Sequence, residues 1–485
     1  MRKAAKKGTG CHLARGVAAA VLALACAAQA VEVAVDAGCA LGPVKPVNGV
    51  GQPPMLGGPT NFRMMHYLKE AGIPFSRLHD VGGAFGGGRY VDIPNVFPDF
   101  DADENDPKSY DFAFTDRLME SLVANGVEPF YRLGVTIENH CTIRRYRIDP
   151  PKDYAKWARI CEHVIRHYNE GWANGHRMNV RYWEIWNEPE NMPDPEENQM
   201  WHAPFSEYIR FYGVVAPYLK ARFPQLKIGG YASCGFYAAS GCGAEAAAKS
   251  TPRTEHFIEC FTNFLAAVRA NGWPLDYFSY HTYAQPGPGA KQLAYGRRTL
   301  DEYGFKGTEL ICNEWLCNGR VGLRGTARQA AGIAAALTVF QNGPCDSAMI
   351  YDARCGVGSY SPLFNPLTEK PHLAYHVFMA FNELRRLGTA IKVSTSGVDA
   401  DAVFATAARG EDGRTALLAV NYSAKPVPLS LKGMCGAVRC RLIDDAHMYE
   451  EVPLPTELPP NSTLLVMAPG NGAKRILKGN ETNGN

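Results

Sequence analysis

Short apolar runs alternate with amphipathic stretches from about residue 45 to residue 387. Runs of this length predict buried strands, and the stretches that follow carry the 3.6-residue spacing of helices. The predicted strands are Val47–Gly51, Pro74–Asp80, Glu128–Gly134, Val180–Pro189, Leu226–Ala232, Tyr277–Tyr283, Glu309–Trp315 and Ser347–Ala353. The predicted helices are Asn61–Ala71, Phe112–Asn125, Asp153–Ala173, Phe205–Arg222, Thr254–Asn271, Gln292–Tyr303, Thr326–Gln341 and His372–Leu387.

Eight strands, each followed by a helix, indicate a closed parallel barrel, so the sequence predicts an α/β fold of the (β/α)8 TIM-barrel type. An open doubly wound sheet is the alternative, and the lack of a Gly-x-Gly-x-x-Gly turn after the first strand weakens it. The long predicted loops Val81–Tyr110, Ser233–Pro252 and Arg354–Lys370 all follow strands. They therefore lie on the barrel face that carries active sites.

The helical period ends near residue 388, and short Val-, Leu- and Thr-rich runs separated by turn residues replace it. This pattern predicts a C-terminal antiparallel β-sandwich. The expected organisation is a barrel over 40–387 and a sandwich over 388–470. Residues 31–39 are a candidate extra strand of the sandwich, and a polar tail over 471–485 is expected to be disordered.

Residues 1–30 have the features of a secretory signal peptide. A basic start precedes the apolar run Gly16–Ala28, and Ala28-Gln29-Ala30 fits a small-residue cleavage site. The mature chain would begin at Val31 and be secreted or periplasmic, with lipid anchoring at Cys26 as a minor alternative. No later stretch is apolar enough to predict a membrane span.

Composition limits the function classes further. The formal net charge of +2 gives no reason to expect nucleic acid or an anionic membrane as partner. Fourteen cysteines are too few for a disulfide scaffold of this length, although Cys234–Cys242 or Cys435–Cys440 could bridge. The chain has no Cys-x-x-Cys or His-Glu-x-x-His pattern, so we expect neither a metal nor a cofactor.

The strongest chemical signal is the segment Tyr182–Pro189, an apolar strand that runs into Asn-Glu-Pro. Period-2 alternation predicts Glu184, Trp186 and Glu188 on one face, with the strand ending at the proline. Glu188 would then lie at the carboxyl end of the fourth strand, among aromatic rings. Burial there predicts a raised pKa, which suits a general acid at neutral pH.

The second signal is the segment Glu309–Trp315, which closes on Glu314 at the end of the seventh predicted strand. Strands four and seven lie across part of a barrel mouth, so Glu188 and Glu314 are expected to face one another over a substrate. A separation of about 5–5.5 Å would indicate a retaining glycosidase, and about 6.5–9.5 Å an inverting one.

These two segments resemble the acid/base and nucleophile segments of clan A glycoside hydrolases, and of glycoside hydrolase family 39 in particular. That family includes β-xylosidases and α-L-iduronidases. The resemblance covers roughly residues 45–390. The further segments that support it are Asp106–Phe112, Gly126–Phe130, Leu226–Gly230 and Phe278–Tyr283. The Gly-rich loop after the second strand and the Ser233–Pro252 insertion depart from the family, so specificity does not carry over.

The resemblance implies that Glu188 is the acid/base and Glu314 the nucleophile, that Asn187 binds the sugar 2-hydroxyl, and that His79 contacts the sugar. From strand position, His281 and Tyr283 are predicted to contact the nucleophile and the sugar. Arg77 is predicted to hold a carboxylate such as Glu314 or Glu184, with an internal ion pair as its alternative. The aromatic side chains Trp315 and Trp201 are candidates for stacking on a sugar or for ordinary core packing.

The sequence therefore predicts a retaining glycoside hydrolase with a carbohydrate substrate, and favours β-xylosidase-like exo-action. Another clan A activity (α-L-iduronidase-, arabinosidase- or endo-glycanase-like) and a non-catalytic carbohydrate-binding barrel remain alternatives. A hydrolase with Cys312 as nucleophile is a third. The sugar, the linkage and the oligomeric state are left open.

Overall fold

The computed structural model describes residues 30–55, 61–81, 90–136, 148–240, 250–397 and 402–470. Most of the predicted signal peptide, the predicted disordered tail and the Gly-rich tract after the second strand lie outside these residues. Cys26 and Cys242 lie outside them as well, so a Cys234–Cys242 bridge stays untested.

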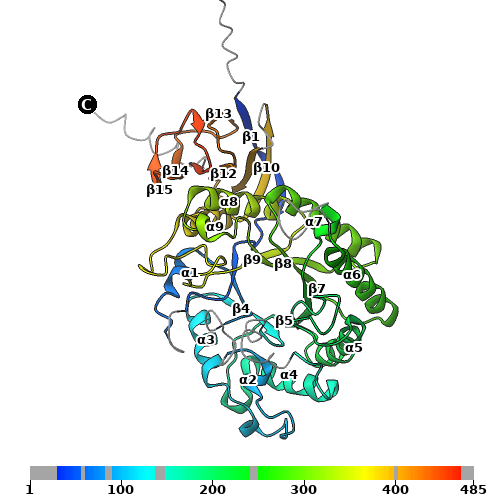
Figure 1. Ribbon diagram of the computed structural model, residues 1–485. Helices are drawn as coiled ribbons and strands as arrows, with labels where there is room; N and C mark the ends of the chain where they lie inside the picture. The colour runs from blue at the N-terminus through cyan, green and yellow to red at the C-terminus, as the bar shows by residue number, and fades with distance from the viewer. Residues whose placement is uncertain are drawn as a thin grey trace, which may run out of the picture.

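Eight parallel strands form a closed barrel in chain order (Figure 1). They are β2 (Gly49–Gly51), β3 (Phe75–Leu78), β4 (Glu128–Leu133), β5 (Tyr182–Ile185), β6 (Lys227–Ser233), β7 (Tyr277–Thr282), β8 (Glu309–Trp315) and β9 (Ser347–Ile350). Pairing of β2 with β9 closes the ring. The predicted barrel is therefore confirmed, and the carboxyl ends of its strands meet at one mouth.

Helices surround the ring in Figure 1. They are α1 (His66–Glu70), α2 (Ile93–Val96), α3 (Ala113–Ala124), α4 (Tyr154–Asn169), α5 (Phe205–Arg222), α6 (Pro252–Asn271), α7 (Pro286–Glu302), α8 (Ala327–Asn342) and α9 (Leu373–Leu387). Short 3-10 turns occupy Pro107–Ser109, Trp172–Asn174, Tyr237–Ser240 and Val321–Leu323. Local capping fixes several boundaries: a capping box at Thr251 starts α6, and Gly272, in the left-handed conformation, ends it.

A nine-stranded sheet covers one side of the barrel, in the order β15-β14-β17-β12-β11-β10-β1-β13-β16. Its strands are β1 (Val31–Pro43), β10 (Thr389–Ser396), β11 (Val403–Arg409), β12 (Thr415–Asn421), β13 (Val427–Lys432), β14 (Arg439–Ile443), β15 (Met448–Val452), β16 (Glu457–Leu458) and β17 (Ser462–Ala468). The N-terminal strand β1 joins it, as predicted for residues 31–39. Because β1 pairs antiparallel with β10 but parallel with β13, the sheet is mixed rather than purely antiparallel.

Both faces of this sheet are buried along β12. Leu417 belongs to an apolar cluster enclosed by the sheet itself, whereas its neighbour Leu418 belongs to the large cluster that includes the barrel and its helices. The sheet lies against α8 and α9 in Figure 1. The barrel and the sheet therefore share one continuous core.

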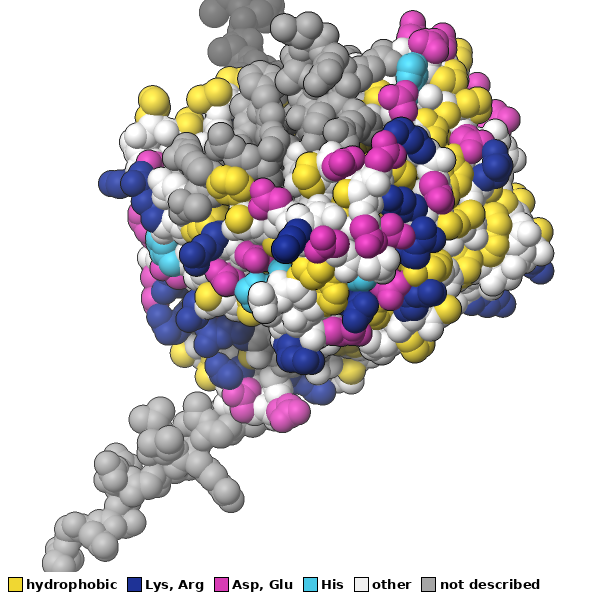
Figure 2. Space-filling view, turned by 90° about the horizontal axis from the view of Figure 1, so that it is seen from below, with side chains coloured by type: hydrophobic (Ala, Val, Ile, Leu, Met, Phe, Trp, Pro, Cys, Tyr) yellow, Lys and Arg dark blue, Asp and Glu magenta, His cyan; other side chains and the backbone are white. Residues whose placement is uncertain are grey.

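One face of the molecule agrees with the balanced composition. The face shown in Figure 2 carries Lys and Arg interspersed with Asp and Glu, with no large area of one sign. Within the described ranges, no helix is long and apolar enough to cross a membrane. Cys435 and Cys440 are free thiols, so that candidate bridge is not formed in this structure.

Candidate active site

The segment that carries Glu188 is not the straight strand that the sequence predicts. β5 ends at Ile185, and Trp186 and Glu188 both have left-handed backbone conformations, with φ of 72° and 44°. The chain therefore turns at Trp186, whose ring packs edge-on against Trp201 at 5.0 Å, in the layer between strands and helices. The prediction that Glu184, Trp186 and Glu188 share one face is wrong for Trp186, because the turn breaks the alternation.

Hydrogen bonds fix Glu188 at the mouth of the barrel. Its backbone N–H donates to the carbonyls of Tyr231 and Ala232 on β6, at 3.2 and 3.1 Å. Its Oε1 lies 2.7 Å from His281 Nδ1, and its Oε2 accepts from Asn191 Nδ2 at 2.8 Å. Its side chain is 13% exposed, so it can still be reached from the mouth.

Glu314, near the end of β8, is held from two sides. Arg77 Nη1 donates to its Oε2 at 2.9 Å, and the Tyr283 hydroxyl donates to its Oε1 at 2.6 Å. Arg77 is buried and forms an ion pair with Glu184 as well, so it contacts both carboxylates that the sequence names for it. This guanidinium favours the ionised form of Glu314.

Glu184 anchors the arrangement from inside the barrel. Its Oε2 accepts from Arg77 Nε at 2.8 Å, and its Oε1 accepts from the Ser279 hydroxyl and the Asn313 amide. These donors compensate the negative charge of the fully buried Glu184 carboxylate, and the ion pair holds Arg77 in place. Arg77 in turn donates to Asn187 Oδ1, so the Asn187 amide nitrogen, with no acceptor among the described residues, is left as a donor.

His281 lies between the two glutamates. Its Nδ1 is 2.7 Å from Glu188 Oε1 and 3.6 Å from Glu314 Oε1. One nitrogen of His281 and one oxygen of each glutamate lie within 4.8 Å of one another. The structure thus brings the two sequence motifs together, with His281 between their glutamates.

Burial and hydrogen bonding act in opposite directions on this group. Burial raises the pKa of Glu188, but the His281 ring and the Asn191 amide lower it more, so its pKa lies below the usual value. The predicted raised pKa of Glu188 is therefore wrong, since the sequence could not reveal the His281 contact. Burial also lowers the pKa of His281, but the two glutamates raise it above 6.5 overall. The pKa of Glu314 is raised, chiefly by burial and by the Glu188 charge, against the lowering effect of His281 and Arg77.

His79, just after β3, is buried beside the site. Its Nδ1 accepts from Arg132 Nε at 3.2 Å, and its Nε2 lies 3.2 Å from Asp80 Oδ1. Burial and the charges of Arg77 and Arg132 hold the pKa of His79 well below 6.5, so the ring is neutral. Its predicted contact with a sugar stays a prediction.

The two candidate stacking tryptophans lie behind the strands. Trp315 is 1% exposed and packs edge-on against Phe340 of α8 at 5.1 Å. Trp201 is fully buried against Trp186 and Tyr208. These positions are those of core aromatics, the alternative that the sequence left open, and neither ring faces the glutamates.

Three residues near the glutamates were not singled out from the sequence. Asn191 donates to Glu188. The buried Glu190 accepts from Ser233 Oγ and Cys234 N. Tyr360, from the loop after β9, is 44% exposed and packs edge-on against Tyr283 at 5.5 Å. Only the position of Asn191 and Glu190 just after the Asn-Glu-Pro motif was a usable signal.

Part of this chain is similar to a known family of proteins. Residues 93–309 match the model of glycosyl hydrolases family 39. Over these residues the chain resembles this family. A β-xylosidase of Geobacillus stearothermophilus is 27% identical over 224 residues, which cover 44% of this chain and 39% of the relative. The chain therefore aligns with well under half of that relative's length.

Solved structures agree with the barrel-and-sheet architecture. A glucosidase from Croceicoccus marinus superposes with a TM-score of 0.69 at 19% identity, covering 90% of this chain and 98% of that one. A monomeric β-xylosidase from Caulobacter crescentus CB15 gives 0.63 at 16% identity, covering 90% and 99%. At these identities the likeness concerns the fold alone.

Proposed function

We propose that this protein is a family 39 glycosidase of the retaining type, which works by double displacement with Glu314 as nucleophile and Glu188 as acid/base. The observation that carries the proposal is the spacing of the two carboxylates, which bring one oxygen each, with a His281 nitrogen, within 4.8 Å. Carboxylate oxygens this close to each other fit a retaining pair, whose carboxyl groups lie about 5–5.5 Å apart, better than an inverting pair, whose carboxyl groups lie about 6.5–9.5 Å apart to leave room for water.

In the first step, a Glu314 oxygen forms a bond to the anomeric carbon and the glycosidic C–O bond breaks. The leaving oxygen takes a proton from Glu188. In the second step, water attacks the same carbon, Glu188 accepts the proton of that water, and the bond to Glu314 breaks. The proposed reaction uses only these side chains, water and the substrate, so it calls for no cofactor.

We also propose that the proton for the first step is held on the Glu188–His281 pair. The raised pKa of His281 favours a protonated ring at neutral pH, and its Nδ1 lies 2.7 Å from Glu188 Oε1. A shift of the proton along this hydrogen bond supplies the acid form of Glu188 without movement of either side chain.

For the substrate, we propose β-xylosidase-like exo-action, supported by the relative named a β-xylosidase. Hydrolysis of a panel of aryl glycosides tests this. The expected result is that an aryl β-xyloside is the best substrate, with release of single sugars from short xylo-oligosaccharides. Faster cleavage of another sugar, or cleavage within long chains, would replace the substrate assignment but leave the double displacement intact.

The acid/base role is tested with Glu188→Ala. This variant should lose about 10²–10⁴ in kcat/KM on substrates with poor leaving groups and recover with added azide, which replaces the attacking water. The exposed Glu197 provides a matched control, because Glu197→Ala should leave turnover unchanged. Full activity of Glu188→Ala on natural oligosaccharides would refute the role.

We further propose export of the protein with cleavage after Ala30. β1 begins at Val31, so this cleavage leaves the first strand of the sheet complete. N-terminal sequencing of protein recovered outside the cytoplasm should begin at Val31. Full-length protein retained in the cytoplasm would contradict the proposal.

A further inference from the structure

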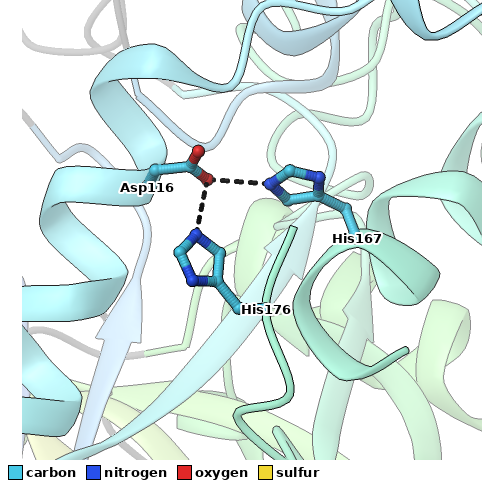
Figure 3. A group of neighbouring side chains, drawn as sticks. All are labelled: Asp116, His167 and His176. Carbon is cyan, nitrogen blue, oxygen red and sulfur yellow. Dashed lines mark hydrogen bonds and ion pairs between the residues drawn. The ribbon is translucent and has the colours of Figure 1, made fainter. Parts of the chain in front are cut away.

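A second group of metal-binding side chains lies away from the glutamates, between α3 and α4. Asp116 is in the first turn of α3, His167 is in the last turn of α4, and His176 follows on the chain leading to β5. Figure 3 shows both imidazole rings aimed at the Asp116 carboxylate. One ligand atom from each of the three lies within 4.8 Å of the others.

Hydrogen bonding fixes which nitrogen of His167 is available. His167 Nδ1 lies 2.9 Å from the carbonyl oxygen of Trp172, so this nitrogen carries the proton. In the neutral ring, Nε2 then presents a lone pair to Asp116 Oδ1, only 2.9 Å away. Two acceptors at this distance repel each other unless a second proton or a cation satisfies both.

A second proton on His167 would satisfy Asp116 but not His176. Its Nε2 is buried, has no hydrogen-bond partner among the residues that the structure describes, and lies 3.6 Å from the same Asp116 oxygen. A proton on His167 would leave this nitrogen unpaired. One divalent cation would satisfy Asp116 and both imidazoles at once.

We propose that Asp116, His167 and His176 bind one zinc ion. Zinc bonds of about 2.0–2.2 Å in tetrahedral geometry place neighbouring ligand atoms about 3.3 Å apart. The observed separations of 2.9 and 3.6 Å from the Asp116 oxygen lie on either side of that value. Two imidazoles and one carboxylate suit zinc, whereas magnesium and calcium prefer oxygen ligands.

The surroundings support the three ligands. The Trp172 carbonyl orients His167, and the Tyr168 hydroxyl donates to Asp116 Oδ1 at 3.0 Å. The Phe112 ring stacks on the His167 ring with centroids 3.6 Å apart. The Asp116 side chain is 26% exposed, which leaves a path for the ion and room for water as a fourth ligand.

This site would have a structural role. It would join α3, the end of α4 and the segment that leads into β5, which precedes Glu188. An ion that binds the folded chain raises its stability by mass action, so zinc should raise the melting temperature. The proposal does not depend on the glycosidase activity, because none of the three ligands contacts Glu188 or Glu314.

The test is calorimetric titration of tag-free, metal-stripped full-length protein with Zn²⁺, with thermal unfolding of the same samples. We expect one zinc per chain and a rise in melting temperature, with no such response to Mg²⁺ or Ca²⁺. Co²⁺ in the same site should give the visible absorption of four-coordinate cobalt. Absence of binding at millimolar Zn²⁺, or an equal response to Ca²⁺, would overturn the proposal.

Variants locate the bound ion. Asp116→Asn and His176→Gln should each weaken zinc binding by about 10–100-fold or more. His202→Gln is the matched control, since His202 pairs with Asp149 and Glu196 on the surface and lies outside the site. Circular dichroism confirms that each metal-free variant is folded. Unchanged zinc affinity in both site variants would place the ion elsewhere and refute the assignment.

Discussion

At the scale of single residues, the two glutamates are held by different kinds of partner. Glu188 accepts from a neutral amide and faces the His281 ring, whereas Glu314 accepts from a guanidinium and a phenol. The residue types at the two motif ends were sufficient to predict that Glu188 and Glu314 meet. The role of His281 as a bridge could not be predicted, because it depends on distances between β7, β8 and the turn that follows β5.

The pH dependence of activity follows from these contacts. Glu314 must be ionised to act as the nucleophile, and its pKa is raised above 4.5. Activity should therefore be lost towards acidic pH, with the midpoint of this loss above pH 4.5. The Glu188–His281 pair must hold a proton, and the pKa of His281 is raised above 6.5. Activity should therefore also be lost towards alkaline pH, with the midpoint of this loss above pH 6.5. A pH–rate profile of kcat/KM measures both limits.

His281→Asn removes the positive ring that lowers the pKa of Glu314. The acidic limit of its pH–rate profile should therefore move to higher pH, with a fall in kcat of about tenfold or more. His202→Asn should leave the profile unchanged. An acidic limit that stays in place, or moves to lower pH, would contradict the bridging role.

Glu190 gives a separate prediction for stability. Burial raises its pKa from 4.5 to about 7, against the donors Ser233 and Cys234. The folded state thus binds this proton more tightly than the unfolded state, so the contribution to stability is present below about pH 4.5 and is lost as pH rises towards 7. The full change is on the order of 3 kcal/mol.

Glu190→Gln should remove that part of the pH dependence. The wild-type melting temperature should fall more between pH 5 and pH 8 than that of the variant, as measured by thermal unfolding at several pH values. Glu197→Gln, at an exposed position, should follow the wild type. Parallel curves for Glu190→Gln and wild type would show that the proton is not bound there.

At the scale of elements, the sequence predicts strand centres better than strand ends. The bounds of β8 are those predicted, because its apolar run closes on Glu314 without a change of backbone conformation. β5 ends four residues before the predicted proline, since Trp186 and Glu188 adopt a left-handed conformation that non-glycine residues rarely take. α7 begins at Pro286, six residues before the predicted start, because proline fits the first helical turn even where glycines follow.

The space around two glycines predicts how their substitution by alanine changes stability. A Cβ on Gly229 of β6 would lie 2.3 Å from the Tyr277 carbonyl of β7, which is backbone and cannot give way. Gly229→Ala should therefore destabilise the protein by about 1–3 kcal/mol or more. A Cβ on Gly287 of α7 meets nothing within 4 Å, so Gly287→Ala should be neutral or stabilising by up to about 1 kcal/mol.

Chemical denaturation of the two variants measures these free energies of unfolding. Equal stability of Gly229→Ala and wild type would mean that β6 and β7 do not approach as closely as the barrel geometry requires.

At the scale of the whole molecule, the barrel and the sheet are joined by more than the chain. Besides the shared apolar cluster, Asn318, which follows β8, donates to the Tyr422 hydroxyl beyond β12 at 2.8 Å. The sequence predicted both parts but not how they pack. It also gave no sign of the group Asp116, His167 and His176, because Asp116 is 51 residues from His167 and no local motif links them.

Tryptophan fluorescence can measure whether the barrel and the sheet unfold together. All seven tryptophans lie between residues 157 and 315, in the barrel. Leu418→Ala, in the sheet, removes side-chain volume from the core shared with the barrel and should cost about 2–5 kcal/mol. The transition reported by tryptophan fluorescence should therefore fall in temperature, although the substitution is in the other part of the molecule.

Leu454→Ala, at a 45% exposed position of the same C-terminal part, should leave that transition unchanged. If Leu418→Ala also left the tryptophan transition in place, the barrel and sheet would unfold independently.

In the proposed reaction, Glu188 and Glu314 act on one anomeric carbon by two successive displacements. The most direct test is proton NMR of the first sugar released from an aryl glycoside, recorded before the product equilibrates between its anomers. Double displacement predicts a first product with the anomeric configuration of the substrate. A first-formed product of inverted configuration would contradict it.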